Sequence, residues 1–219
     1  KILKSIIMKI VSIILARGGS KGIPDKNIID LNGRPLIYYS INAAQKAKIP
    51  EVWVSTDSKK IAMVAKQYNA KIIDRPKNLA TDTSSSEDAL NHFSKNIDFD
   101  IMVFIQPTSP LLHSSDIVKG LDLVKNGTYD SIFSAYKEHW IPRWNLNLKP
   151  MNWSISNRPR RQDVDEKYVE NGAFYITTKE QFLSTGIRYG GRIGVIEMPI
   201  KRSFQIDTYE DLDLIKKLF

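Results

Sequence analysis

The 219-residue sequence has no cysteine, only three histidines and no apolar run long enough to span a membrane. Without cysteine, disulfides and thiolate metal sites are excluded, and a reducing, cytoplasmic environment is expected. His92, His113 and His139 lack the spacing of metal ligands, so we expect them at the surface or in packing roles. The apolar stretch at 2–16 is broken by lysines and is shorter than the ~20 residues that a membrane-spanning helix needs. We therefore expect no membrane segment.

Hydrophobic residues make up 42% of the chain, which suits one domain with a substantial core. We expect this domain to span residues 8–219, with Met8 as the natural start and residues 1–7 as an extension. The formal net charge is +8, so nucleic acid, an anionic membrane surface and small polyanions are all compatible partners. The cations are dispersed, and most single lysines are expected to be solvated surface.

Short apolar runs alternate with segments of helical periodicity, a pattern typical of βαβ units and an α/β fold. The run at 101–105 is apolar at every position, as in a central strand of a parallel sheet that is covered on both faces. The predicted strands are 9–15, 52–55, 71–73, 101–105, 130–135, 172–177 and 192–198, and the predicted helices are 35–46, 59–68, 86–96, 115–125 and one that begins at 208.

The periodic pattern weakens from 136 to about 168. This segment is expected to leave the core as a partly irregular excursion with exposed aromatic side chains, which often mark an interface. Its tryptophans are Trp140, Trp144 and Trp153. Three arginines nearby are either solvated or able to hold an anion or an acidic partner: Arg158, Arg160 and Arg161.

The first predicted strand leads into the glycine-rich run 16–22 (ARGGSKG), which carries Arg17 and Lys21 and is followed by Lys26. Glycines allow tight turns that bring backbone N–H groups close to an anion, and the cations offset the charge of a polyphosphate. The spacing matches neither the Walker A motif nor the Gly-x-Gly-x-x-Gly pattern. The run is thus interpreted as a phosphate-binding loop, with a solvated basic turn as the alternative.

Polar segments follow several predicted strands: 17–27, 56–58, 106–110 and 205–208. Ligands of open α/β sheets bind at the carboxyl ends of the strands, so we expect these four segments to lie together. Asp57 is either a metal or ribose contact or an ordinary turn residue.

The last predicted helix begins with a capping pattern, in which Thr208 is the N-cap and Asp211 the acidic member three residues later. Asp207 is not needed for this cap. Its carboxylate is a hard oxygen ligand of the kind that Mg²⁺ prefers, so it is a candidate metal ligand, with a turn residue as the alternative. Asn171-Gly172, before an aromatic run, is also good turn chemistry.

Several motifs together resemble the bacterial acylneuraminate cytidylyltransferases, or CMP-sialic acid synthetases. They run in family order from residue 9 to the end and comprise 16–22 (ARGGSKG) with 26–27 (KN), 31–36 (LNGRPL), 55–58 (STDS), 75–76 (RP) with 79–83 (LATDT), 106–111 (QPTSPL), 161–162 (RQ), 171–176 (NGAFYI) and 207–212 (DTYEDL).

The resemblance implies a single Rossmann-like nucleotide-diphospho-sugar transferase domain with a mostly parallel sheet. A small protruding segment at about 136–190 would mediate a homodimer. The implied reaction joins CTP to the anomeric hydroxyl of an acidic nine-carbon sugar, with pyrophosphate released and Mg²⁺ required. Neither nucleic acid nor a membrane is then a partner.

The resemblance also implies site residues. Arg17, Ser20 and Lys21 would hold the CTP phosphates, with Lys26 and Asn27 completing the loop. Arg75, Ser84 and Ser86 would lie around the cytidine. Gln106, Asn171 and Tyr175 would face the sugar acid, with Arg143 replacing a lysine of the family. Asp207 would bind Mg²⁺, and Arg17, Lys21 and Asp207 would be the catalytic charges.

Two departures from the family pattern fall near the sugar and the metal. Gln205 stands where the family usually has a second aspartate, and the surroundings of Arg143 and of Arg188-Tyr189 match poorly. They suggest a modified nonulosonic acid, such as legionaminic acid. The alternatives are a KDO or other sugar nucleotidyltransferase of the same fold and, remotely, a non-catalytic basic module that binds nucleic acid.

Overall fold

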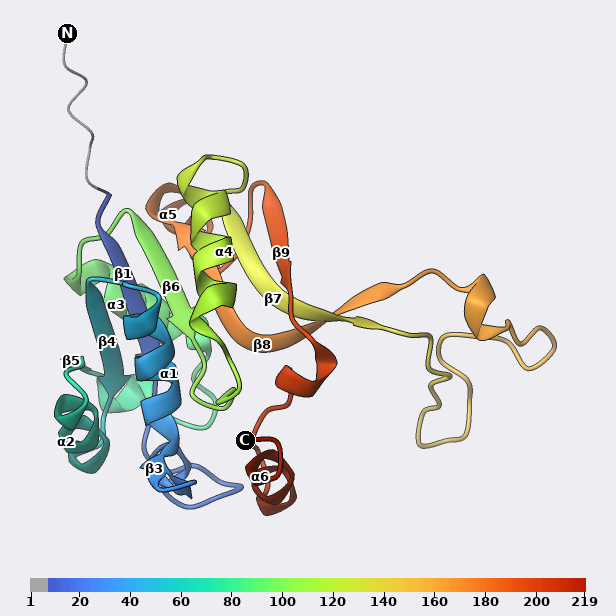
Figure 1. The fold of residues 1–219 in the computed structure, drawn as a ribbon, viewed down its shortest axis with the longest axis horizontal. Coiled ribbons are helices and arrows are strands. Elements are labelled where there is room, and N and C mark those ends of the chain that lie inside the picture. Colours follow the sequence, from blue (N-terminus) through green and yellow to red (C-terminus); the bar gives the residue numbers. More distant parts are fainter. Residues whose placement is uncertain (1–7) are drawn as a thin grey trace, which may run out of the picture.

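The protein is built around one seven-stranded β-sheet, described by a computed structural model of residues 8–219 (Figure 1). Its strands are β1 (Ile10–Leu15), β4 (Glu51–Thr56), β5 (Lys71–Asp74), β6 (Ile101–Ile105), β7 (Ser131–Glu138), β8 (Lys167–Thr178) and β9 (Ile193–Glu197). Their order in space is β5-β4-β1-β6-β8-β7-β9, and β8 alone in this sheet runs antiparallel to its neighbours. The predicted α/β fold with a mostly parallel sheet is confirmed. The expectation that residues 1–7 are an extension falls outside the described residues.

Helices cover both faces of this sheet. One face is covered by α1 (Leu36–Lys46), α2 (Lys59–Gln67) and α4 (Ser114–Lys125), and the other by α3 (Ser86–Asn96) and α5 (Lys179–Thr185). The last helix, α6 (Tyr209–Lys216), packs through Leu212 and Ile215 in a cluster with Leu31 and Leu36. Short 3-10 helices occur at Lys26–Ile28, Lys77–Leu79, Arg161–Asp163 and Ile200–Arg202.

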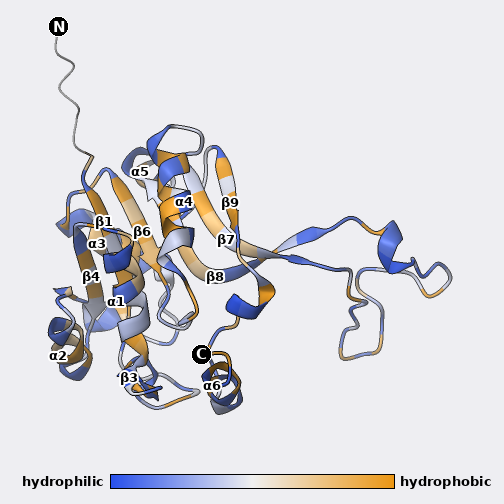
Figure 2. Ribbon diagram, in the orientation of Figure 1, coloured by the Kyte–Doolittle hydropathy of each residue, from blue (hydrophilic) through white to orange (hydrophobic). Residues whose placement is uncertain are grey.

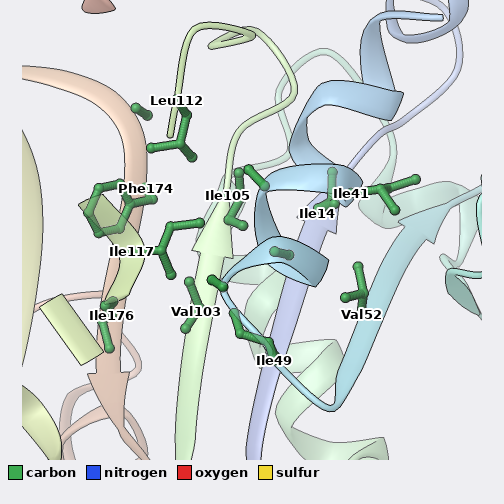
Figure 3. Packing of buried hydrophobic residues seen from close by; sticks show 14 of the residues in the cluster. Ile14, Ile41, Ile49, Val52, Val103, Ile105, Leu112, Ile117, Phe174 and Ile176 are labelled. Atoms are coloured by element: carbon green, nitrogen blue, oxygen red, sulfur yellow. The ribbon is translucent and has the colours of Figure 1, made fainter. Parts of the chain in front are cut away.

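Side-chain alternation along β6 explains the two covered faces. Val103 and Ile105 belong to the cluster under α1 and α4, whereas Met102 and Phe104 belong to the cluster under α3 and α5. Successive strand residues point to opposite faces, so a strand that is apolar at every position is buried twice. Figure 3 shows Ile105 of this strand among the labelled side chains of the first cluster.

Two small elements were not predicted from the sequence. Strands β2 (Asp30–Leu31) and β3 (Arg34–Pro35) form a hairpin around Asn32 and Gly33, whose φ angles of 51° and 77° suit the tight turn of a two-residue loop. Helix α5 is short and follows β8 directly. Asn171-Gly172 is not a chain-reversing turn but an irregularity inside β8, where the pairing with β7 shifts register and Gly172 has φ of 66°.

An arm projects from the body where β7 and β8 continue past the other strands (Figure 1). Residues 139–166 form its irregular outer part, with isolated bridges between Trp144 and Pro150 and between Ser154 and Asn157. Figure 2 shows a mostly hydrophilic arm interrupted by apolar stretches, in contrast to the apolar strands of the body. Residues 139–166 thus stand away from the body, whereas residues 171–185 lie in the body, in the inner part of β8 and in α5.

The aromatic side chains of the arm are less exposed than the sequence suggested. Trp144 is 49% exposed, but Trp140 and Trp153 are half-buried, and the rings of Trp144 and Trp153 meet edge to face with centroids 5.0 Å apart. Arg158 stacks over Trp153 at 5.3 Å, and Arg160 pairs with Asp163 at 2.7 Å. Within residues 8–219, no helix is long and apolar enough to cross a membrane.

Candidate active site

A cleft of about 260 Å³ opens at the carboxyl ends of β1 and β6. Leu15, Phe104 and Pro107 give it an apolar floor, and most of its remaining lining is polar. Eight residues that were singled out from the sequence line this cleft: Arg17, Ser20, Lys26, Asn27, Arg75, Ser84, Ser86 and Gln106. The cleft is thus a cationic and hydroxyl-rich hollow over an aromatic ring.

The glycine-rich loop after β1 is held at both ends by its neighbours. The Gly18 amide donates to Asp57 Oδ1 at 2.8 Å, and the Asn27 side chain donates to the Arg17 carbonyl at 3.0 Å. At Gly22, a Cβ atom would lie 2.4 Å from the Asp207 carbonyl oxygen, so the close approach of the two backbones requires glycine here. The loop is therefore held in a defined conformation by specific contacts, unlike a solvated basic turn.

The four polar segments expected at the strand ends do meet. Beside the Gly18–Asp57 contact, Lys26 Nζ pairs with Asp207 Oδ1 at 2.8 Å, and the Ile206 amide donates to the Thr108 carbonyl at 2.9 Å. The segments 17–27, 56–58, 106–110 and 205–208 therefore surround one edge of the sheet, as the sequence predicted.

The cations of the loop are each paired with a carboxylate. Arg17 contacts Asp82 at 2.7 Å and Lys21 contacts the other oxygen of Asp82 at 2.9 Å. Hydrogen bonds from Lys21 and Arg17 hold the pKa of Asp82 below its ordinary value. Lys21 is exposed at the rim and is not among the residues that line the cleft, whereas Lys26 is largely covered.

Arg75 supplies a fixed positive charge opposite the loop. Its side chain is buried and donates from Nε to Ser55 Oγ at 3.0 Å and from a terminal nitrogen to the Ser55 carbonyl at 2.8 Å. Burial lowers the pKa of Arg75 to about 10, against the opposing effect of the Asp57 carboxylate, so the group stays charged at neutral pH. Ser84 and Ser86 lie next to it at the start of α3, where the helix dipole is positive.

Two residues expected to face a sugar are buried and are not among those that line the cleft. Tyr175 is 3% exposed, stacks on Phe104 with centroids 5.5 Å apart and donates to Glu170, and burial raises the pKa of its hydroxyl. Asn171 is buried, and its side-chain oxygen accepts from Ser134 Oγ at 2.6 Å. Their direct contact with a sugar stays a prediction.

Arg143 lies in the arm, where it pairs with Glu138 at 2.5 Å. The lining of the cleft includes no residue of the arm, so Arg143 and the cleft of the same chain are not brought together. The sequence-based role of Arg143 in sugar binding also stays a prediction.

The residues that could hold a cation are few. The Asp207 side chain is 65% exposed beside the cleft loop, with one oxygen paired to Lys26. The Gln205 amide is engaged within the fold, since it donates to the Asn171 carbonyl and accepts from Thr108 Oγ1 at 3.3 Å. Within residues 8–219, no cluster of three or more His, Cys, Asp or Glu could hold a metal. A single carboxylate fits Mg²⁺ that takes its other ligands from phosphate oxygens and water.

One contact near the cleft was not foreseen from the sequence. Arg188 donates to both oxygens of Glu87, at 2.6 and 2.8 Å, and its guanidinium lies over the rings of Phe104 and Tyr175. The partners are 101 positions apart, and neither sits in a recognisable pattern. The pair ties the first turn of α3, next to Ser86, to the aromatic floor of the cleft.

Comparison with known proteins gives consistent matches. A family model described as cytidylyltransferase matches residues 11–219. The chain is 40% identical over 213 residues to N-acylneuraminate cytidylyltransferase A of Danio rerio, covering 93% of this chain and 49% of that protein. It is 34% identical over 224 residues to a pseudaminic acid cytidylyltransferase of Campylobacter jejuni, covering 97% of both. The chain thus spans about half the length of the first of these relatives and nearly all of the second.

Solved structures share the fold. The structure of a CMP:2-keto-3-deoxy-manno-octonic acid synthetase complexed with CTP superimposes with a TM-score of 0.69 at 20% identity, covering 96% of this chain and 98% of that one. A 4-diphosphocytidyl-2C-methyl-D-erythritol synthase from Anaerococcus prevotii gives 0.67 at 14% identity, covering 96% and 97%. At these identities, the likeness speaks for the fold alone.

Proposed function

The chain belongs to the cytidylyltransferase family, and from this membership and the geometry of the cleft we propose that it transfers CMP from CTP to the anomeric hydroxyl of a nonulosonic acid. The observation that carries the proposal is the cationic glycine-rich loop, which is docked at the carboxyl edge of the sheet as one wall of a polar cleft. Anionic phosphates are bound by such backbone turns and by cations near them.

The nucleotide would lie across the cleft. Its triphosphate would contact the loop through Arg17, Ser20 and Lys21, with Lys26 and Asn27 at the end of the loop. The cytidine would lie toward Arg75, Ser84 and Ser86, over the ring of Phe104. The opposite rim, near Gln106, leaves room for the acid sugar, and Asn171 and Tyr175 would shape that side from below.

In the reaction, the anomeric oxygen of the sugar attacks the α-phosphorus of CTP in line with the leaving group. The bond between this phosphorus and the oxygen that bridges to the β-phosphate breaks, and pyrophosphate leaves with that electron pair. The proton of the anomeric hydroxyl passes to solvent, since no side chain stands out as its acceptor. Catalysis of this kind rests on positioning and on positive charges near the phosphates, which here are those of Arg17 and Lys21.

Asp207 is the residue that we propose to hold Mg²⁺. Its exposed carboxylate stands beside the loop. The Gln205 amide is already hydrogen-bonded within the fold. The ion would therefore take one ligand from the protein, the Asp207 carboxylate, and others from oxygens of the triphosphate. The bound ion would offset negative charge on the phosphates. Lys26 would then exchange its contact with Asp207 for one with a phosphate oxygen.

The acceptor is proposed to be an acidic nine-carbon sugar. Relatives at 34–40% identity are named for N-acylneuraminate and pseudaminic acid. The departures at Gln205 and Arg143 favour a modified acid, such as legionaminic acid, over plain N-acetylneuraminate. A cytoplasmic location, predicted from the lack of cysteine, stays a prediction.

A homodimer formed through the arm is also part of the proposal. The outer loops of the arm carry large apolar side chains that are at least half exposed in the single chain: Ile141, Leu146, Leu148, Met151 and Ile155. Exposed apolar surface of this kind is typical of an interface. Arg143 sits among them, so it could serve a sugar site only if the arm of one copy reached the cleft of another.

The direct test is pyrophosphate release from CTP with N-acetylneuraminate, legionaminate, pseudaminate and KDO in parallel. We expect turnover with a nonulosonic acid, and a loss of about 10²-fold or more in Arg17→Ala and Lys21→Ala, because each removes a positive charge that stabilises the transition state. Lys119→Ala, an exposed lysine of α4, is the matched control and should keep full turnover.

Two results would count against the proposal. Turnover with KDO and with none of the nine-carbon acids would support the alternative of another sugar nucleotidyltransferase. Full turnover in both loop variants would remove the phosphate-binding role of the loop.

A further inference from the structure

Asp82 occupies the position of an anion between two cations of the glycine-rich loop. Its two carboxylate oxygens contact Arg17 and Lys21, at 2.7 and 2.9 Å. Within residues 8–219, these two side chains are its only hydrogen-bond or ion-pair partners. A carboxylate between two phosphate-binding cations resembles, in charge and reach, one oxygen edge of a phosphate.

Neighbouring carboxylates are used differently. Asp57 accepts the Gly18 amide and Asp211 accepts the backbone of Thr208, so both hold the fold. Asp82 accepts no backbone group, and it stands in the exposed turn between the 3-10 helix Lys77–Leu79 and α3. Hydrogen bonds within that turn hold its shape without Asp82. The Thr81 amide donates to Ser84 Oγ at 3.1 Å, and Ser84 Oγ donates to the Asn78 carbonyl.

We propose that Asp82 is an internal counterion that competes with the phosphates of the nucleotide and thereby lowers the affinity of the cleft for triphosphate and pyrophosphate. This inference rests on the proposed function for the identity of the natural anion. In the free chain, Asp82 keeps Arg17 and Lys21 together in one place. On binding, an anion with several charges displaces it, and the carboxylate moves into solvent.

Exposure explains why the exchange is feasible. The side chains of Lys21 and Asp82 are 74% and 42% exposed, so their mutual attraction is weakened by water and contributes little stability. A pyrophosphate group offers more charge and more acceptor oxygens to the same cations than one carboxylate does. A nucleoside monophosphate offers fewer, so it leaves Asp82 in place. Asp82 therefore weakens the binding of CTP and pyrophosphate and leaves the binding of CMP nearly unchanged.

The test is calorimetric titration of the whole chain and of Asp82→Asn with CTP, inorganic pyrophosphate and CMP. We expect Asp82→Asn to bind CTP and pyrophosphate about threefold to tenfold more tightly, and CMP with a change of less than about twofold, because only the larger anions must displace the carboxylate. Asp98→Asn is the matched control. It removes a carboxylate that pairs with Lys179 at 2.6 Å, ahead of β6 and so at the other end of the sheet, and it should bind all three ligands as the unchanged chain does.

Unchanged or weaker binding of CTP and pyrophosphate in folded Asp82→Asn would overturn the proposal, as would equal tightening for CMP. Asp82→Ser also removes the carboxylate and should give the same result, which would show that the effect does not depend on the asparagine amide. Thermal melts report whether each variant is folded. If the unchanged chain binds no CTP, the proposed function fails. The pyrophosphate titration still decides the role of Asp82 in that case.

Discussion

At the level of single residues, burial divides the cations of the cleft into fixed and exchangeable groups. Arg75 is buried and its guanidinium is committed to Ser55, so its position does not depend on a ligand. Lys21 is 74% exposed, and among the residues that the structure describes Asp82 is its only ion-pair partner. Exposed pairs are weak and buried ones are costly to break. We therefore propose that Arg75 places the nucleotide and that Arg17 and Lys21 capture its phosphates.

The ion pair between Glu87 and Arg188 makes a prediction about stability and pH. Hydrogen bonds from Arg188 hold the pKa of Glu87 below its ordinary value. A lowered pKa in the folded state means that the stabilisation is complete above the unfolded pKa of about 4.3 and is lost as the pH falls through the folded value. Glu87→Gln should lower the free energy of unfolding by about 1–2 kcal/mol at pH 7, and by much less at about pH 3.

Urea denaturation at both pH values measures this difference. An equal destabilisation at neutral and acid pH would assign the role of Glu87 to packing rather than to charge. The double variant with Arg188→Gln separates the two explanations further, because a pairwise interaction makes the losses non-additive.

Residue-scale features were predictable where they are local in the sequence. Arg17, Lys21 and Lys26 stand among glycines after an apolar strand, so their common site could be inferred before the fold was known. The contacts of Arg17 with Asp82 and of Arg188 with Glu87 bridge 65 and 101 positions, and no periodicity carries such information. The engagement of the Asn171 amide inside β8 was hidden for the same reason.

At the level of elements, the start of α6 positions the proposed metal ligand. Thr208 Oγ1 accepts from the Asp211 amide at 3.2 Å, and the Asp211 carboxylate accepts from the amides of Thr208 and Asp207, at 2.8 and 3.0 Å. The cap predicted from the sequence is therefore confirmed, and it also fixes the backbone of Asp207.

Removing this cap should weaken both the fold and the metal site. Thr208→Ala is expected to cost about 1 kcal/mol of unfolding free energy and Thr208→Ser much less, because serine keeps the hydroxyl that accepts the N–H. Thr208→Ala should also raise the Mg²⁺ concentration needed for half-maximal pyrophosphate release. Chemical denaturation and a Mg²⁺ titration measure the two effects. Equal behaviour of the alanine and serine variants would show that the hydroxyl is not the important group.

The length of a helix or strand determined whether it could be predicted from the sequence. The long helices and the central strands have enough residues to show a clear period, and they were predicted with ends close to those observed. Helix α5 has seven residues and the β2–β3 strands two each, too few for a period to appear. The Asn32-Gly33 pair, which lies inside the family motif at 31–36, is itself a hairpin signal.

At the level of the whole molecule, the arm stands out because several of its large apolar side chains remain exposed in the single chain. The body buries its apolar residues on both faces of the sheet, while the arm exposes Leu146 almost completely and Leu148 at 78%. The sequence indicated an excursion because regular patterning stopped near 136. Its projection from the extended β7–β8 ribbon depends on long-range strand pairing, which the local pattern does not encode.

The proposed dimer predicts how the arm responds to charge. Leu146→Asp with Leu148→Asp should convert a dimer to a monomer in analytical ultracentrifugation, because burying two carboxylates in an apolar interface is costly. Met63→Asp, at an exposed position of α2 in the body, is the matched control and should stay dimeric. A wild-type chain that sediments as a monomer at every concentration tested would rule out the dimer.

The most direct test of the whole account is a crystal structure of the chain with CTP and Mg²⁺. We predict that the triphosphate lies against the loop at 17–26, with Lys21 released from Asp82, the ion beside Asp207 and the cytidine between Arg75 and the start of α3. A nucleotide bound elsewhere, with the loop still closed on Asp82, would contradict the account.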